Sequence, residues 1–247
     1  MVCPYKFCVR NCPMLQYPYA NPQFDEDMRI PPQSNPITVT TIQKNYKKPF
    51  IQADLRIPEF HGIANTKIQD YINNSIMSDV TEFSDQMSAA AQENGSNAQK
   101  NKEKFIPYVI SSIYQLTYNK NNVISLVMVY YELVQGRNNF IKVPYNYDIT
   151  TGKSLMLKDL FVPGTNYKQL INNEVLKQLE KNKQNYFPGT AENFKGIAED
   201  QPFYLKDGNL EVFFGFNQIA PTAAGIPVFE IPLSSFGNAL KPAFRQE

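Results

Sequence analysis

The chain has 247 residues, of which 43% are hydrophobic, so it is long enough to form one large domain or two small ones. The net charge is +1 and the arginines are scattered, which argues against a nucleic-acid-binding surface. No apolar run approaches the ~20 residues needed to cross a bilayer, and the N-terminus lacks the ~7–15-residue apolar core of a secretory signal. We therefore expect no membrane span and cytoplasmic synthesis.

Residues 1–36 differ in composition from the rest of the chain. They contain seven of the 18 prolines and all three cysteines, without a helical or strand period. Proline removes backbone hydrogen-bond donors, so we predict a disordered tail. The spacing of Cys3, Cys8 and Cys12 does not match a zinc ribbon. Two interpretations remain open: reduced thiols, or a tail that captures metal or cross-links once its surroundings become oxidising.

The next segment predicts two strands followed by a helix. The strands are expected over residues 37–42 and 50–58, with Pro58 closing the second and a loop at 59–62. Asn65 is a good N-cap for an amphipathic helix over 66–92. Its apolar positions step at three and four residues: Ile68, Tyr71, Ile72, Ile76, Val80, Phe83, Met87 and Ala90. Such a stripe is typical of a helix packed on a core.

A polar loop over residues 93–104 precedes the densest run of Val, Ile and Tyr in the chain. Alternation over 108–118 predicts a strand with one buried face. The tetrad at 119–122 predicts a tight reversal, because Asn tolerates positive φ. The run at 123–134 is apolar on both faces, which is typical of a strand inside a sheet. A third strand is expected over 140–149, followed by a glycine-containing turn.

The C-terminal part repeats this plan. A second amphipathic helix is predicted over residues 166–181. Asp207-Gly208-Asn209 between two apolar runs is a strong hairpin signal. A last strand over 226–233 carries two prolines, which favours a position at a sheet edge.

Together these elements predict an α+β fold with two consecutive β-rich units. Each unit should have mostly antiparallel strands and one amphipathic helix. We expect the first unit over residues 37–136, the second over 137–236 and a short tail over 237–247.

The sequence gives little support for catalysis. His61 is the only histidine, and no serine-hydrolase or nucleotide-binding motif is present. Glu132, Asp148 and Asp159 lie near predicted strand ends, where an acid/base pair is one interpretation and capping of turns is the more common one. We therefore expect no enzyme activity, no cofactor and no metal site.

Tyrosine is the abundant side chain with recognition value, because it combines rigid aromatic area with a hydroxyl. Packing within the sheet is the alternative role. The tyrosines of the predicted sheet are Tyr108, Tyr114, Tyr118, Tyr130, Tyr131, Tyr145 and Tyr147.

Four segments carry a family resemblance. They read IPEFHGIANTKIQDYINNSI, VISLVMVYYELVQG, YNYDITTGKSLMLKDLF and IAPTAAGIPVFEIPLSSF. In this order they resemble paired bacterial domains of unknown function, covering about residues 37–236. Such a pair forms the lysozyme-binding ectodomain of the anti-sigma factor RsiV and precedes the catalytic domain of the peptidoglycan deacetylase PdaC. Where RsiV-like members carry a Gly-Gly-Ala-His-Gly run, this chain has the loop 135–139.

The resemblance implies a non-enzymatic binding module for a protein or a cell-wall-derived ligand. The candidate ligand surface is that loop with two neighbouring tyrosines: Tyr130, Tyr131, Gln135, Gly136, Arg137, Asn138 and Asn139. The alternative is a structural protein of the spore or envelope of a spore-forming bacterium, anchored through its Cys/Tyr tail. A carboxylate-dependent hydrolase is a more remote alternative.

Overall fold

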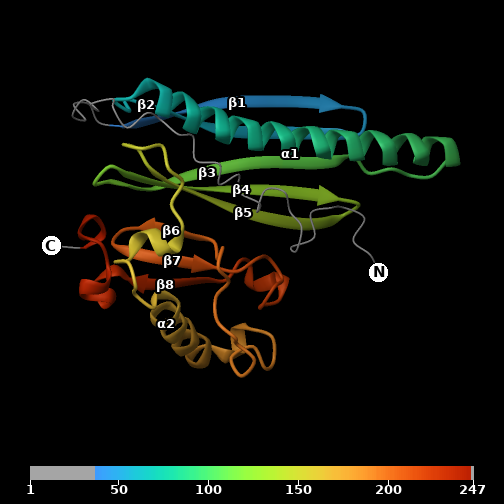
Figure 1. The fold of residues 1–247 in the computed structure, drawn as a ribbon. Coiled ribbons are helices and arrows are strands. Elements are labelled where there is room, and N and C mark those ends of the chain that lie inside the picture. Colours follow the sequence, from blue (N-terminus) through green and yellow to red (C-terminus); the bar gives the residue numbers. More distant parts are fainter. Residues whose placement is uncertain (1–36, 246–247) are drawn as a thin grey trace.

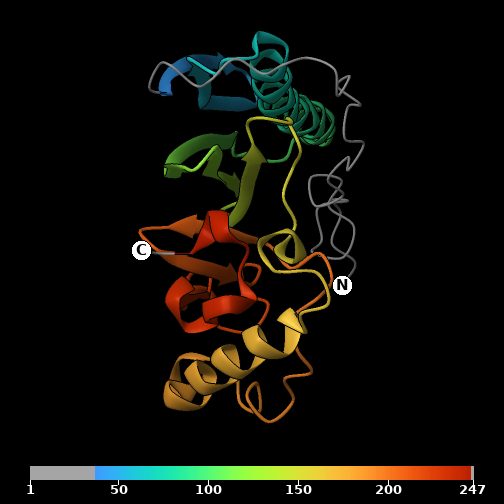
Figure 2. The ribbon, with the colours of Figure 1, turned by 60° about the vertical axis from the view of Figure 1, so that its left-hand side comes forward.

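The computed structural model describes residues 37–245 and confirms the α+β fold (Figure 1). A five-stranded and a three-stranded sheet are stacked, and one helix packs on the outer side of each (Figure 2). The larger sheet contains β1 (Thr38–Lys48), β2 (Ile51–His61), β3 (Tyr108–Lys120), β4 (Val123–Val134) and β5 (Arg137–Asp148) in that spatial order. The smaller contains β6 (Phe203–Lys206), β7 (Asn209–Phe213) and β8 (Val228–Pro232).

Helix α1 (Thr66–Asn101) connects the only parallel pair of strands in the described part of the chain, β2 and β3. The Asn65 side chain caps the helix as predicted, accepting hydrogen bonds from the backbone N–H groups of Lys67 and Ile68. The helix continues beyond its predicted end at Gln92, so the polar loop expected over residues 93–104 is wrong for most of its length. The reason lies at Gly95, where a Cβ would stand 2.3 Å from the ring of Phe50. A glycine that weakens a helix in isolation here permits close packing on Phe50, in the turn before β2.

Strand β2 also continues past its predicted end. It runs through Pro58 to His61, so residues 59–61 are strand rather than loop. Strand β3 pairs with β2 only as far as Leu55, so Pro58 lies where one edge of β2 is no longer in the ladder. The buried Ser112 hydroxyl donates to the Arg56 carbonyl just beyond that point, at 3.1 Å.

The β3–β4 hairpin confirms the predicted reversal. Asn121 and Asn122 have φ values of 52° and 59°, as a two-residue turn of the primed type requires. The predicted alternation fails near the end of β3, where the register shifts between Leu116 and Tyr118. This irregularity moves Tyr118 from the core under α1 to the core of the smaller sheet.

Strand β4 is buried on both faces, as predicted. Leu126 and Met128 belong to the core under α1, whereas Val127 packs with Tyr204 and Phe213 of the smaller sheet. One face of β4 therefore packs against α1, and its other face packs against the smaller sheet.

Strand β5 belongs to the larger sheet and not to the second unit. It pairs with β4 from Val134↔Arg137 to Val123↔Asp148. The connecting turn, Gln135-Gly136, has positive φ at both residues, which favours direct antiparallel return. The boundary between the sheets thus falls after residue 148, C-terminal to the division expected at residue 137.

Helix α2 (Tyr167–Lys181) and the Asp207-Gly208 hairpin match their predictions. Strand β8 pairs only with β7 among the described strands, which confirms its edge position. Residues 237–245, expected as a polar tail, instead pack on this unit. Leu240 and Phe244 are buried, and the Lys241 backbone N–H donates to the Leu160 carbonyl at 2.9 Å.

Candidate functional site

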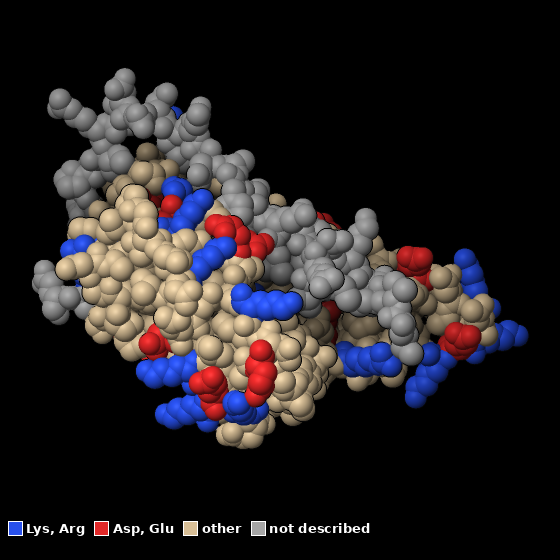
Figure 3. All heavy atoms as spheres, turned by 60° about the horizontal axis from the view of Figure 1, so that its bottom comes forward, with Lys and Arg blue, Asp and Glu red and all other residues tan. Residues whose placement is uncertain are grey.

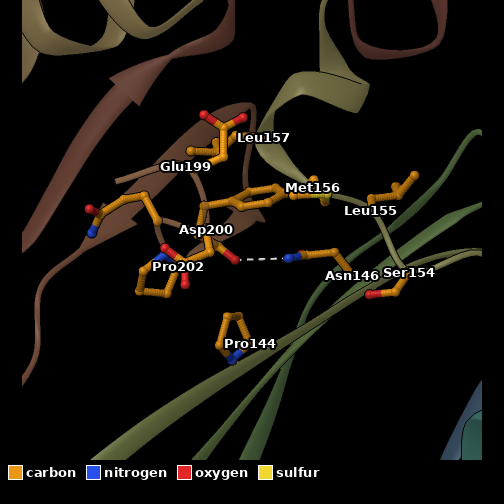
Figure 4. Close-up of a pocket in the computed structure, with 11 residues that line it drawn as sticks. Pro144, Asn146, Ser154, Leu155, Met156, Leu157, Glu199, Asp200 and Pro202 are labelled. Atoms are coloured by element: carbon orange, nitrogen blue, oxygen red, sulfur yellow. Dashed lines mark hydrogen bonds between the residues drawn. The ribbon is translucent and has the colours of Figure 1, made fainter. Parts of the chain in front are cut away.

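A hydrogen bond between β5 and β6 joins the two sheets, and we call this region the polar seam. Asn146 Nδ2 donates to the Phe203 carbonyl at 2.8 Å, shown by the dashed line in Figure 4. The pocket beside this bond, between Pro144, Met156 and Pro202, has a volume of about 20 Å³. That is room for about one water molecule, so this pocket is too small to hold a ligand.

A larger hollow lies further along the same seam. It is lined from β5 by Phe140 and Lys142, and from the smaller sheet and its following loop by Phe213, Phe216 and Ile226. We call this the aromatic hollow. Its volume is about 220 Å³. Ligand pockets typically measure ~300–1,000 Å³, so this one suits one or two side chains of a partner.

An aromatic ladder connects the hollow with the tip of the β4–β5 hairpin. The Tyr131 and Phe140 ring centroids are 5.2 Å apart, and those of Phe140 and Phe216 are 5.4 Å apart. The Tyr131 hydroxyl donates to Asn138 Oδ1 at 2.9 Å. Phe140 and Phe216, which are 76 positions apart in sequence (140 to 216), thus form one surface with the hairpin loop.

Lys142 places a cation at the floor of the hollow. Its Nζ lies 5.3 Å from the Phe213 ring centroid and 5.4 Å from that of Tyr204. Burial lowers the pKa of Lys142, an effect that the nearby Glu211 carboxylate opposes. Burial likewise raises the pKa of Glu211, and the charge of Glu230 adds to this. The hollow therefore combines aromatic side chains with Lys142, the Asp200 carboxylate and the amide groups of Asn139, Gln201 and Gln218.

Most of the predicted ligand surface lies at the hairpin tip next to the hollow. Gln135, Gly136, Arg137 and Asn138 are exposed, and Asn139 is half-buried with its amide donating to Glu132. Tyr130 is an exception: it is fully buried, 4.8 Å from the Phe83 ring of α1. Neighbouring strand residues point to opposite faces, so Tyr131 lies on the face of Phe140 and the hollow, and Tyr130 lies in the core.

Of the predicted ligand surface, Asn139 lines the hollow, whereas sequence reasoning missed Phe140, Lys142, Phe213, Phe216 and Ile226. Phe140 and Lys142 alternate along β5, but that pattern does not show which surface covers them. Phe216 and Ile226 come from the loop between β7 and β8, where no periodicity marks them. Only the packing of the two sheets brings these positions together.

The three predicted carboxylates do not form an acid/base pair with one another at strand ends. Asp148 lies opposite Val123, nine positions along β4 from Glu132, which is about 30 Å of strand. Asp148 accepts hydrogen bonds from the Thr150 backbone and hydroxyl, and Asp159 accepts from Lys153 and the Met156 backbone. Both therefore stabilise local turns.

Glu132 differs from the other two carboxylates. It is 8% exposed, Oε2 accepts a hydrogen bond from Asn139, and Oε1 has no partner among the described residues. Burial raises the pKa of Glu132, and the bond from Asn139 partly offsets this.

The single histidine lies far from the hollow in the fold. His61 ends β2, and its Nε2 is 2.8 Å from Thr40 Oγ1 and 3.2 Å from Glu59 on the outer strands. Among residues 37–245 no group of three or more metal-binding side chains is placed to hold an ion. Cys3, Cys8 and Cys12 lie outside the described residues.

Charge does not single out a site on the face in Figure 3, where basic and acidic side chains are interspersed. Within the described chain, no helix is both long and apolar enough to cross a membrane.

Comparison with known families confirms the resemblance. Residues 44–134 match the model of the family described as Deacetylase PdaC, and residues 158–234 match that of the Protein of unknown function (DUF3298). No curated protein matches the chain significantly.

Two solved structures share the fold. A DUF3298 family member from Bacteroides fragilis aligns with a TM-score of 0.65 at 16% identity, over 84% of this chain and 94% of that one. A DUF3298 family protein from Pseudomonas aeruginosa aligns with a TM-score of 0.62 at 16% identity, over 86% and 98%. Strand β5 lies between the two family matches, so neither match alone contains the aromatic hollow.

Proposed function

We propose that this chain, which matches the PdaC and DUF3298 family models in succession, is a non-enzymatic module that binds a protein ligand. The observation that carries the proposal is the aromatic ladder from Tyr131 to Phe216, which ends in a hollow beside an exposed hairpin. Aromatic anchors beside a polar rim are typical of protein interfaces.

The composition of the hollow favours a protein over a cell-wall glycan at this surface. Its lining offers the apolar area of Phe140, Phe213, Phe216 and Ile226 on one side. Beside them lie polar groups of Asn139, Lys142, Asp200, Gln201 and Gln218. A leucine, methionine or aromatic side chain of a partner would bury its apolar surface there. The exposed Arg137 and Asn138 then form the polar rim.

The remote hydrolase alternative lacks a matching arrangement. Glu132 and Asp148 lie at opposite ends of the sheet, and Asp148 and Asp159 are engaged in turns.

The structural alternative depends on the N-terminal cysteines. Cell fractionation with and without reductant tests it, because a cross-linked envelope protein would be released only by reductant.

The first experiment measures binding of the full chain to immobilised hen egg-white lysozyme, the probe suggested by the RsiV resemblance. Soluble muropeptides serve as the comparison ligand. We expect saturable binding to lysozyme, weakened at least tenfold by Phe216→Ala because an anchor side chain is lost. Phe216 is half-buried in a loop, so the variant should remain folded.

Thr222→Ala is the matched control, because Thr222 is exposed in the same segment between β7 and β8 and does not line the hollow. It should bind as tightly as the unchanged chain. Failure to bind lysozyme, or equal loss in both variants, contradicts the proposed site. Saturable muropeptide binding that Phe216→Ala weakens would instead assign the hollow to a wall-derived ligand.

A further inference from the structure

A second groove lies on the opposite face of β5 from the aromatic hollow. It is lined by α1 through Tyr71, Asn74, Ser75, Ser78 and Asp79, and by β5 through Tyr145 and Tyr147, with Ser154 beside them. We call this the helix groove. Its volume is about 450 Å³, within the ~300–1,000 Å³ of typical ligand pockets. Because successive β5 side chains alternate, Phe140 and Lys142 face the hollow whereas Tyr145 and Tyr147 face the helix groove.

The helical lining forms a stripe of its own. Tyr71, Asn74, Ser75, Ser78 and Asp79 are spaced at three and four residues, so they share one face of α1. This polar stripe runs beside the buried apolar stripe of the helix. Asn74 and Ser78 are exposed, so their amide and hydroxyl are accessible from the groove.

Hydrogen bonds and a ring contact hold the side chains that line the groove in fixed positions. Asp79 Oδ2 accepts a hydrogen bond of 2.7 Å from the Tyr145 hydroxyl, which fixes the carboxylate against β5. The Tyr71 and Tyr147 rings meet edge to face with centroids 6.5 Å apart. Ser75 donates to the Tyr71 carbonyl at 2.8 Å. Burial raises the pKa values of Asp79 and Tyr147.

The chemistry of this lining identifies a class of ligand. Asp79 offers only acceptors when ionised, whereas the Ser78 hydroxyl and the Asn74 amide both donate and accept. A ligand hydroxyl also donates and accepts, so a polyhydroxylated ligand satisfies all of these groups. An ammonium group would leave the donors unused, and an anion would face Asp79 with no lysine or arginine in the lining.

We propose that the helix groove binds a neutral saccharide, whose hydroxyls are held by Asn74, Ser78 and Asp79 beside the half-buried Tyr71 ring. This site is separate from the protein-binding hollow, so either proposal can fail without the other.

The test is a titration of the ¹⁵N-labelled full chain followed by NMR. The probes are chitotetraose, cellotetraose and, as a cationic comparison, tetralysine. We expect saturable shifts from both saccharides or from one of them, centred on residues 71–79 and 145–154. Shifts from chitotetraose alone would show that the acetamido group contributes, whereas equal shifts would show that the hydroxyls suffice.

The double variant Asn74→Ala/Ser78→Ala should weaken saccharide binding about tenfold, because two hydrogen bonds are lost. Both side chains are exposed, so the fold should be preserved. Asn97→Ala, on the exposed surface of the same helix and outside the groove, is the control and should bind normally. Absence of saccharide shifts, shifts located elsewhere, or saturable binding of tetralysine alone overturns the proposal.

Discussion

Ser125 Oγ on β4 donates to Asn146 Oδ1 on β5 at 2.5 Å, and both side chains are buried. The same Ser125 oxygen accepts from the Leu205 backbone N–H at 3.0 Å, while Asn146 Nδ2 donates to the Phe203 carbonyl. Two side chains of the larger sheet thus satisfy the free backbone edge of β6. Because buried polar groups need partners, this network fixes how the smaller sheet sits on the larger one.

Replacing Ser125 by Ala should lower the free energy of unfolding by about 1–3 kcal/mol, because the buried N–H of Leu205 loses its acceptor. Urea denaturation monitored by circular dichroism measures the change. Ser234→Ala, an exposed serine substitution, is the control and should stay within about 0.5 kcal/mol of the unchanged chain. If the two variants were equally stable, the hydrogen bonds of Ser125 would contribute nothing measurable to the free energy of unfolding.

Gly95→Ala should destabilise the protein even though Ala is the better helix former by about 1 kcal/mol. The new Cβ would stand 2.3 Å from the Phe50 ring, and overpacking of this kind costs about 1–3 kcal/mol. The nearby exposed Asn97→Ala should be neutral or stabilising. Thermal denaturation separates the two, and a Gly95→Ala variant with raised Tm would contradict the close packing of Gly95 on Phe50.

Several elements could be predicted from the types of residues that are neighbours in the sequence. Positive φ at Asn121 and Asn122 and at Asp207 and Gly208 follows from residue types that tolerate it, so both hairpins were predictable. Asn65 likewise marks the start of α1. Predictions failed where residues distant in sequence are in contact. Helical Gly95 packs against Phe50, and buried Leu240 pairs with Phe161.

The candidate site was predictable only in part. The hairpin residues Gln135–Asn139 are contiguous, so the turn and its exposure could be read from the sequence. Tyr130 and Tyr131 are adjacent, and identifying which of them lies outside the core requires knowing which face of β4 meets α1. The contact between the Phe140 and Phe216 rings depends on how the two sheets stack, and this cannot be predicted from neighbouring residues in the sequence.

Stability should fall with rising pH because of Glu132. Burial raises its pKa above the ordinary value of 4.5, although the Asn139 hydrogen bond partly offsets this. The folded state then binds more protons than the unfolded state, so the free energy of unfolding decreases as pH rises from about 4.5 toward the raised pKa. Glu132→Gln cannot titrate and should lack this contribution.

Urea denaturation of both proteins from pH 4 to pH 7 provides the measurement. The stability of Glu132→Gln relative to the unchanged chain should increase across this range. Glu93→Gln, which alters an exposed carboxylate on α1, should show no such trend. A flat difference for Glu132→Gln would mean that burial of this carboxylate carries no protonation cost.

Phe216 and Arg137 should affect ligand binding in different ways. Phe216 is half-buried beside the hollow and should act as an anchor, so Phe216→Ala should mainly raise the dissociation rate, by about 30-fold for a loss of ~2 kcal/mol. Arg137 is exposed at the rim. Arg137→Ala should mainly lower the association rate, by a few-fold, and reduce its dependence on salt.

Kinetics on immobilised lysozyme at low and at physiological salt distinguish these effects. The anchor role predicts that the loss in Phe216→Ala is nearly independent of salt, since apolar burial is little screened. The rim role predicts that Arg137→Ala and the unchanged chain converge as salt increases. If Arg137→Ala instead raised the dissociation rate as much as Phe216→Ala, the ligand would be centred on the hairpin tip and not on the hollow.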